Sequence, residues 1–458
     1  MQIKHNFGLP TSCHSFQKVA FILFLAFCLL PSAFSQNWDT YRGPKSSGVF
    51  DNANLPDVWS GKTGENIQWK TPIPGIGLSS PVIWEDKLFV TTASSQDDES
   101  GLKPGLYGDI TPVADSSIHD WIVYCIDTKS GDIIWEQIAC TGVPKQKRHP
   151  MSSHASASMA TDGDYAVAFF GSEGLYCYDM DGDLQWKKDF GVLRSVFYMV
   201  EEAEWEWASS PIIHDGVVLL QVDVMDQSYV AALDITNGNE LWRTNRDEDP
   251  TWCTPNVYKH EGKTRVVLNG YKHRGAYDLK TGKEVWKMAG GGDIPIPTPQ
   301  VYGKMIYFNS SHGRMRPIYA IKTSASGDIS LADGEDTNEF VEWSNKSEGA
   351  YMANILIYKD LLYVGKWNGS MACFDAKTGE QYYKVTLARG KSFTGSPVAA
   401  DGKIYFTNDE GTVFLLEAGK KFNKISEQKL GATCMVTPAI KKDQIFFRTT
   451  EGIMAVGE

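Results

Sequence analysis

The chain has 458 residues, of which 44 are basic and 56 acidic, and aromatic residues make up 12% of it. This acidic balance would repel the phosphates of a nucleic acid, so we expect no nucleic-acid partner. The 42 glycines and the many aromatic residues are typical of an all-β protein with short strands and tight turns.

The first 35 residues have the pattern of a signal peptide. Lys18 precedes the apolar run 19–30, and Ala33 and Ser35 are the small residues that a signal peptidase reads. We expect cleavage after Ser35, which leaves 42 basic and 56 acidic residues and a net charge of −14. No later stretch is long enough to span a membrane, so we expect a secreted or periplasmic protein. An uncleaved anchor is one alternative; a lipoprotein is another, although Phe27 stands where a small residue should precede a lipidated Cys28.

An internal repeat follows an N-terminal extension of residues 36–65. The repeat is clearest in residues 209–242, where four short apolar strands are joined by turns that include Asp215-Gly216 and Asn237-Gly238. We place the starts of eight units at Ser80-Pro81, Ser156-Ala157, Ser210-Pro211, Thr254-Pro255, Thr298-Pro299, Ala353-Asn354, Ser396-Pro397 and Thr437-Pro438. The units end on Trp135, Trp186, Trp242, Trp286, Trp343, Tyr383 and Ile425, 40–57 residues apart.

The last unit lacks its fourth strand, and residues 66–70 near the other end of the chain have the form of one. Joining the two ends would close a ring and leave no open sheet edge. We therefore predict a single eight-bladed β-propeller of four-stranded antiparallel blades over residues 66–458, with each closing aromatic packed between neighbouring blades. Seven blades with a C-terminal cap is the structural alternative.

Six cysteines remain after the signal segment. Cys125, Cys177 and Cys373 share one position of the repeat, which Ala232 holds in another unit, and this indicates small buried core residues. A disulfide between any two of Cys125, Cys140, Cys253 and Cys434 is possible after export, but the sequence does not indicate which would pair.

All but one of the long insertions fall on one face of the predicted ring, in the loops between second and third strands and between blades. Such loops are where a repeat protein usually binds its ligand. The exception is 323–339, on the opposite face. The polar and aromatic residues of the long-loop face form our candidate ligand site: His149, His154, Trp205, Trp207, Asp223, Arg246, Asp247, Glu248, Trp252, Asp293, His312, Arg314, Lys366 and Trp367. Taken singly, each charged residue is better explained as a solvated loop residue. Together they suit a carbohydrate, a peptide or a metal, and the two nearby histidines do not by themselves define a zinc site.

Two stretches, 276–286 and 373–380, resemble the repeat of the pyrroloquinoline-quinone-type (PQQ-like) propeller family. Residues 38–44 and 171–179 are similar to a secreted bacterial subgroup of it. The resemblance covers nearly all of the mature chain and implies the fold more firmly than an activity.

Two branches of that family imply rival functions. Quinoprotein dehydrogenases bind PQQ and calcium, and their adjacent cysteine pair and haem domain are absent from this sequence. The other branch is a non-catalytic scaffold of outer-membrane protein assembly. We expect an exported, monomeric, non-catalytic scaffold that binds a small ligand, a glycan or an envelope protein. The alternatives are a PQQ- and calcium-dependent dehydrogenase acting on alcohols or sugars, and metal-dependent hydrolysis or lyase chemistry using His149, His154, Asp247 and Glu248.

Overall fold

The structure is a computed structural model that describes residues 1–6, 8, 37–95, 97, 101–106, 111–313 and 315–458. Residues Met1–Gln36 form one unit, in which the predicted apolar run and cleavage site lie outside the described residues. Residues Asn37–Glu458 form the other unit, to which all strands belong. Within the described residues, no helix has the length and apolar character needed to cross a membrane.

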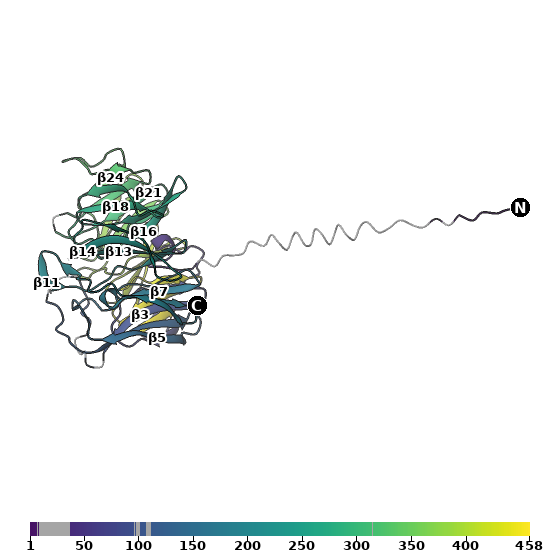
Figure 1. Ribbon diagram of the computed structural model, residues 1–458, viewed down its shortest axis with the longest axis horizontal. Coiled ribbons are helices and arrows are strands. Elements are labelled where there is room, and N and C mark those ends of the chain that lie inside the picture. The colour runs from purple at the N-terminus through teal and green to yellow at the C-terminus, as the bar shows by residue number, and fades with distance from the viewer. Residues whose placement is uncertain (7, 9–36, 96, 98–100, 107–110, 314) are drawn as a thin grey trace. The chain divides into compact units, whose positions relative to one another are not determined.

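Asn37–Glu458 folds into eight sheets of four antiparallel strands, which are the blades of the predicted propeller. Figure 1 shows the blades following one another in chain order. Blades one to four consist of β2 (Val82–Trp84), β3 (Lys87–Ser94), β4 (His119–Asp127) and β5 (Ile133–Gly142); β6 (Ala160–Thr161), β7 (Tyr165–Phe169), β8 (Leu175–Asp179) and β9 (Leu184–Lys188); β12 (Ile212–His214), β13 (Val217–Val224), β14 (Gln227–Asp234) and β15 (Glu240–Asn245); and β16 (Asn256–His260), β17 (Lys263–Leu268), β18 (His273–Asp278) and β19 (Glu284–Ala289).

Blades five to eight continue the series: β20 (Gln300–Tyr302), β21 (Met305–Asn309), β22 (Ile318–Lys322) and β24 (Val341–Asn345); β25 (Leu356–Tyr358), β26 (Leu361–Gly365), β27 (Ser370–Asp375) and β28 (Gln381–Thr386); β29 (Val398–Ala400), β30 (Lys403–Thr407), β31 (Thr412–Glu417) and β32 (Lys424–Lys429); and β33 (Ala439–Lys441), β34 (Gln444–Thr449), β35 (Gly452–Val456) and β1 (Ile67–Pro72). Eight blades are confirmed.

Three short additions complete the fold. β23 (Gly327–Asp328) pairs in parallel with β19 at the outer edge of blade four, and it lies in the predicted exception loop 323–339. A hairpin of β10 (Val196–Phe197) and β11 (Val200–Glu204) lies between blades two and three and projects from one side of the ring in Figure 1. Two short 3₁₀ helices are η1 (Pro44–Ser46) and η2 (Gly171–Glu173).

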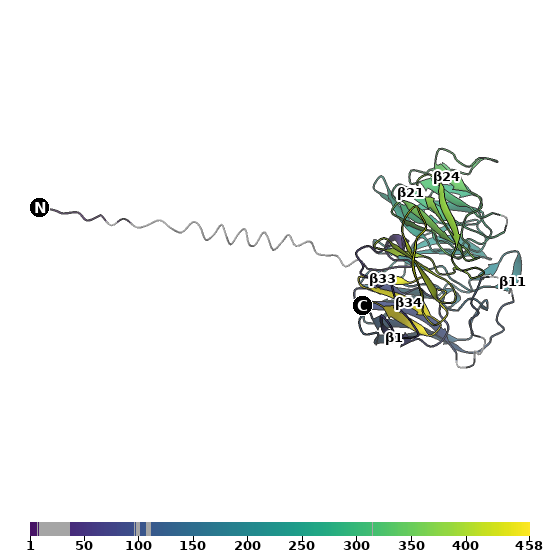
Figure 2. The ribbon, with the colours of Figure 1, turned by 180° about the vertical axis from the view of Figure 1, so that it is seen from behind.

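The ring is closed by the two ends of Asn37–Glu458. β1 pairs antiparallel with β35, with Trp69 opposite Ala455 and Thr71 opposite Ile453. Figure 2 shows β33 and β34 beside β1, although they come from opposite ends of the sequence. The predicted closure is therefore confirmed.

The predicted extension crosses the face of the ring that carries the tight turns. Trp38 exchanges both backbone hydrogen bonds with Ile83 of blade one, and the amide of Phe50 donates to the carbonyl of Ala399 in blade seven. Between them, Arg42 is fully buried, and its guanidinium donates to the carbonyl oxygens of Ser46, Ser47, Ile355 and Pro397 at 3.1–3.3 Å. The segment thereby links blades one, six and seven.

The closing tryptophans pack between blades, as the sequence predicts. The indole N–H of Trp186 donates to the carbonyl of Ile235 in blade three at 2.6 Å, and its ring covers Gly238 in the following turn. The same indole-to-carbonyl bond joins Trp69 to Thr128, Trp135 to Met180, Trp242 to Leu279 and Trp343 to Ala376. Trp286 departs from this pattern and donates to the hydroxyl of Tyr258, because 323–339 replaces the tight turn of blade five.

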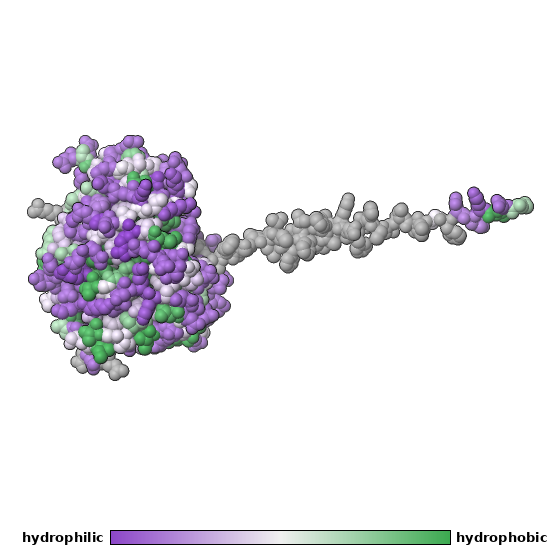
Figure 3. All heavy atoms as spheres, viewed as in Figure 1, coloured by the Kyte–Doolittle hydropathy of each residue, from purple (hydrophilic) through white to green (hydrophobic). Residues whose placement is uncertain are grey.

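The blades pack through apolar faces, and the molecular surface is mostly hydrophilic with small separate hydrophobic patches on the side shown in Figure 3. Cys125, Cys177 and Cys373 are buried, as predicted for core residues. All six cysteines between Asn37 and Glu458 are free thiols, so no disulfide contributes to this unit.

We predict that Gly238→Ala destabilises the ring, because the added Cβ would lie 2.6 Å from the Trp186 ring in a residue with φ of 70°. Gly216 is the matched control, since its φ is 76° and an added Cβ meets nothing within 4 Å. We expect Gly238→Ala to lower the free energy of unfolding by about 3 kcal/mol and Gly216→Ala by about 1 kcal/mol, measured by denaturant titration. Equal losses would show that the indole contact is unimportant.

Candidate functional site

A cavity of about 280 Å³ opens on the long-loop face, where the innermost strands of the blades converge. Its floor is formed by residues just before those strands, and its wall by the long loops. Tyr41 reaches the floor from the opposite face, where Asn354 donates to its hydroxyl at 2.9 Å. The extension therefore contributes to the bottom of this cavity, which we call the funnel.

A series of hydrogen bonds between blades forms the funnel floor. The amide of Ser80 donates to the hydroxyl of Ser158, the amide of Ser158 to that of Ser210, and the amide of Ser210 to that of Thr254, at 2.8–3.0 Å. Asn354, Ser396 and Thr437 continue the pattern on the other side of the ring. These residues explain most of the Ser-Pro and Thr-Pro starts in the sequence. In blade two the hydroxyl that accepts the amide of the preceding blade belongs to Ser158, two residues after the predicted start at Ser156.

Aromatic side chains form one wall of the funnel. The rings of Phe197 and Trp205 are stacked, with 5.5 Å between their centroids and 3° between their planes. Trp252 lies 5.2 Å from Trp205, and His149 meets Trp205 edge-on at 6.0 Å. The insertion 189–207 places two of these rings, because Phe197 ends β10 and Trp205 follows β11.

The wall continues through His312 and Tyr351. Their rings lie 5.4 Å apart, and His312 also meets Phe197 edge-on at 5.6 Å. Nδ1 of His312 lies 2.5 Å from a carboxylate oxygen of Asp293, which fixes the orientation of the imidazole. Asp293 thus supports the wall from behind.

A buried polar layer holds the wall in place. Nδ1 of His154 lies 2.7 Å from the carboxylate of Glu206, and the indole N–H of Trp252 donates to the backbone carbonyl of Glu206 at 2.9 Å. Burial, followed by the negative charge of Glu206, raises the pKa of Glu173 to about 7. His154 is 5% exposed and does not line the funnel, so its contacts indicate a positioning role.

Three further predicted site residues form a buried ion network in blades three and four. Nε of Arg246 lies 3.1 Å from Asp223, and Nη2 lies 3.6 Å from Glu248. The carboxylate of Glu248 also accepts the amides of Tyr271, Lys272 and His273. Buried charges need such compensation, and none of the three residues lines the funnel.

The remaining predicted residues lie elsewhere. Trp207 packs in the core against Phe169, with ring centroids 4.8 Å apart. Asp247 is in solvent and pairs with Lys272, while Lys366 pairs with Glu348. Trp367 is 38% exposed outside the funnel. Arg314 lies outside the described residues.

The structure thus brings His149, Trp205, Trp252 and His312 together in the funnel, with Asp293 and His154 behind the wall. Sequence reasoning missed Phe197, Tyr351 and Tyr41 as lining residues. Phe197 could have been predicted as a lining residue, because it is an aromatic residue within a predicted insertion. Tyr41 lies in the predicted extension, and nothing local in the sequence indicates that it reaches the axis of the ring.

Comparison with known proteins identifies the family. A family model described as outer membrane protein assembly factor BamB matches residues 119–287 and 226–456. The chain belongs to this family. No curated protein sequence matches it significantly.

Solved structures share the fold of this BamB-family chain at low sequence identity. BamB from Moraxella catarrhalis is 14% identical with a TM-score of 0.54, and the match covers 80% of this chain and 97% of that one. A europium-containing methanol dehydrogenase is 12% identical, with a TM-score of 0.58 and coverage of 90% and 89%. Quinohemoprotein alcohol dehydrogenase from Comamonas testosteroni is 11% identical, with a TM-score of 0.62 and coverage of 94% and 81%.

PQQ and calcium are the cofactors that the resemblance to quinoprotein dehydrogenases implies. PQQ carries three carboxylates and calcium prefers oxygen ligands that include carboxylates. The described side chains lining the funnel include no Lys, Arg, Asp or Glu, and the described residues contain no group of three or more His, Cys, Asp or Glu arranged to hold a metal ion. These residues do not fit PQQ with calcium.

We predict a pH-dependent effect from Asp409, whose carboxylate accepts the amide and hydroxyl of Thr394 at the funnel wall. Burial raises the pKa of Asp409 from 3.8 to about 7. Between pH 3.8 and about 7 the carboxyl group of Asp409 is ionised in the unfolded chain but keeps its proton in the folded one. The contribution of Asp409 to the free energy of unfolding therefore falls as the pH rises through this range.

Asp409→Asn should therefore match the wild type near pH 4 and exceed its unfolding free energy by about 2–4 kcal/mol above pH 7. Denaturant titrations across this range provide the measurement, with the exposed Asp183→Asn as control. A stability difference that does not change with pH would contradict the assignment.

Proposed function

We propose that this chain is an exported, non-catalytic binding propeller that holds a neutral glycan in its funnel. The observation that carries the proposal is the combination of the Phe197–Trp205–Trp252 wall with a floor of serine and threonine hydroxyls. Binding sites for small molecules typically combine aromatic surfaces with a few placed polar groups. The apolar faces of a sugar ring stack on aromatic rings, and its hydroxyls need donors and acceptors.

The charge of the lining supports a neutral ligand. None of the described lining side chains carries a fixed charge, and His149 and His312 are its only titratable side chains besides tyrosines. An anionic or cationic ligand would lose its hydration without gaining an opposite charge. The poor fit to PQQ and calcium is the reason for preferring a binding function to a dehydrogenase.

The cellular location is part of the proposal. The predicted signal segment supports export, and the family description places BamB in outer membrane protein assembly. We propose the same general location for this chain, in the periplasm or outside the cell.

An envelope protein is the second candidate partner, favoured by exposed apolar residues on the insertion that builds the wall. Met199, between β10 and β11, is 58% exposed, and Val192 is 51% exposed. Such a partner would contact the hairpin and leave the funnel to the smaller ligand.

We predict that neutral cello-, chito- or malto-oligosaccharides bind saturably and change the tryptophan fluorescence. Trp205→Ala should weaken that binding by about tenfold or more, because it removes the central ring of the wall. Phe197→Ala should act in the same direction, and Trp367→Ala is the matched control outside the funnel. Circular dichroism checks that each variant is folded.

The same preparation tests the rival activity. We expect no reduction of an artificial electron acceptor with alcohols or sugars after PQQ and Ca²⁺ are added. Robust turnover, or saturable PQQ binding without any saccharide binding, would contradict the proposed function.

A further inference from the structure

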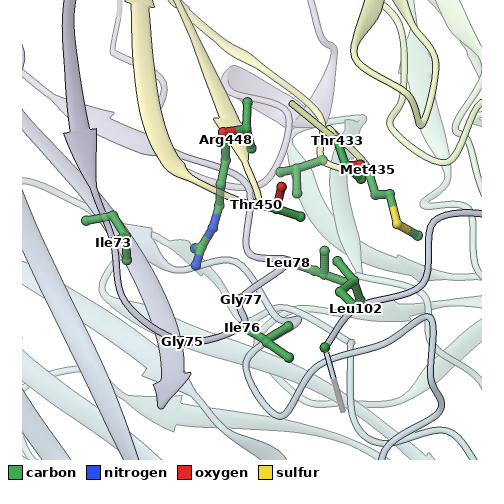
Figure 4. A pocket seen from close by; sticks show the side chains of 13 residues that line it. Ile73, Gly75, Ile76, Gly77, Leu78, Leu102, Thr433, Met435, Arg448 and Thr450 are labelled. Atoms are coloured by element: carbon green, nitrogen blue, oxygen red, sulfur yellow. The ribbon is translucent and has the colours of Figure 1, made fainter. Parts of the chain in front are cut away.

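A second cavity, of about 350 Å³, lies between blades eight and one. It adjoins the funnel, since Leu78, Met435 and Val436 line both. Figure 4 shows the side chain of Arg448 extending from β34 into this cavity, toward Gly77 and Ile76. Unlike the funnel, this cavity contains a guanidinium group.

Arg448 is buried without a carboxylate to balance its charge. It is 3% exposed, and no Asp or Glu among the described residues forms an ion pair with it. Its Nη1 donates to the hydroxyl of Ser79 and the carbonyl of Thr91, both at 2.6 Å. Nε and Nη2 make no hydrogen bond to a described residue. Burial lowers the pKa of Arg448 to about 9.

Two other buried arginines have their charge compensated in different ways. Arg246 pairs with Asp223 and Glu248. Arg42 uses all three guanidinium nitrogens to donate to four backbone carbonyls. A buried cation that has neither arrangement is costly. Arg274 is another such case, since its Nε and Nη1 have no hydrogen-bond partner among the described residues, but it lies over the rings of Phe308 and Tyr319 and lines neither cavity. Arg448 differs because its free edge faces a cavity.

The local backbone leaves space for that free edge. A Cβ added to Gly77 would lie 1.9 Å from Nη2 of Arg448 and 2.5 Å from the carbonyl oxygen of Thr91. Only glycine at this position permits the observed place of the guanidinium. Nε and one Nη are the pair of donors that a carboxylate accepts side by side.

We infer that this cavity binds a small organic monocarboxylate, whose carboxylate pairs with the free edge of Arg448 and whose apolar body contacts Ile73, Ile76 and Leu102. A single guanidinium matches a single negative charge. Thr433, Thr449 and Thr450 add hydroxyl groups beside the aliphatic side chains of the lining. The inference does not depend on the glycan proposed for the funnel.

The experiment uses octanoate as probe, with octanamide and octylamine as neutral and cationic analogues of the same chain length. Octanoate should bind the wild-type protein saturably by calorimetry and raise its melting temperature, while the two analogues should do neither. Phenylacetate tests a rigid carboxylate in the same assay.

Arg448→Met should weaken octanoate binding by about 10- to 100-fold, because charge-assisted hydrogen bonds are lost. Arg448→Lys keeps the charge but not the paired donors, and should weaken binding by about tenfold. Arg389→Met is the matched control, since it removes the charge of an exposed arginine outside the cavity. It should leave the affinity unchanged.

The inference is overturned if neither octanoate nor phenylacetate binds saturably, because Arg448 is then satisfied by solvent alone. It is also overturned if both Arg448 variants, shown to be folded by circular dichroism, bind octanoate as tightly as the wild type. Loss of octanoate binding with retained saccharide binding separates this site from the funnel.

Discussion

The pairing of β1 with β35 is the constraint on which the rest of the ring depends. Residues 67–72 complete a blade whose other strands come from residues 439–456, so the first and last parts of the folded unit must meet. An unpaired edge at blade eight would expose backbone donors and acceptors and leave blade one without its neighbour. The hydrogen bonds of Arg42 to the carbonyls of Ile355 and Pro397 also hold the ring together, because they link blades across the face with the tight turns. The funnel floor exists only because the eight innermost strands are held in this ring.

The contacts between neighbouring blades explain why the loops of one face can vary in length while the arrangement of the blades stays the same. A tryptophan near the end of one blade covers a glycine turn of the next and donates to its backbone, and the arrangement recurs around much of the ring. These contacts lie in the regular part of the repeat, away from the insertions. The insertions can therefore lengthen and bring aromatic side chains such as Phe197 and Trp205 to the axis of the propeller without disturbing the contacts between blades. Binding residues on loops above a rigid scaffold are a general arrangement in repeat proteins.

The repeat predicted the architecture because its signals are local: apolar strands, Gly turns and closing aromatics at regular spacing. In blade two the residue that bonds to the neighbouring blade is Ser158, two positions after the predicted start at Ser156. Both serines alternate with small residues, so either one fits the repeat pattern. The site was harder to predict, because residue type does not reveal what a side chain contacts. His149 and His154 lie in one segment, yet one lines the funnel and the other is buried against Glu206. Asp223, Arg246 and Glu248 have the composition of a polar site, but they pair with one another inside the protein. Tyr41 and Arg448 gain their roles from contacts with distant parts of the chain.

The two neighbouring cavities differ in charge although they share part of their lining. The funnel presents aromatic rings and hydroxyls, and the cavity beside it presents a guanidinium whose charge no described acid balances. The second cavity lies between blades eight and one, next to the blade in which the ring closes.

Closure can be measured directly by native-state hydrogen exchange of the backbone amides. The account predicts that the amides of β1 and β35 exchange only in the global unfolding reaction, with the same free energy of opening as those of β13 and β14 in blade three. Exchange of β1 and β35 at a much lower free energy, while blade three stays protected, would contradict it. That result would describe an open ring whose last edge frays.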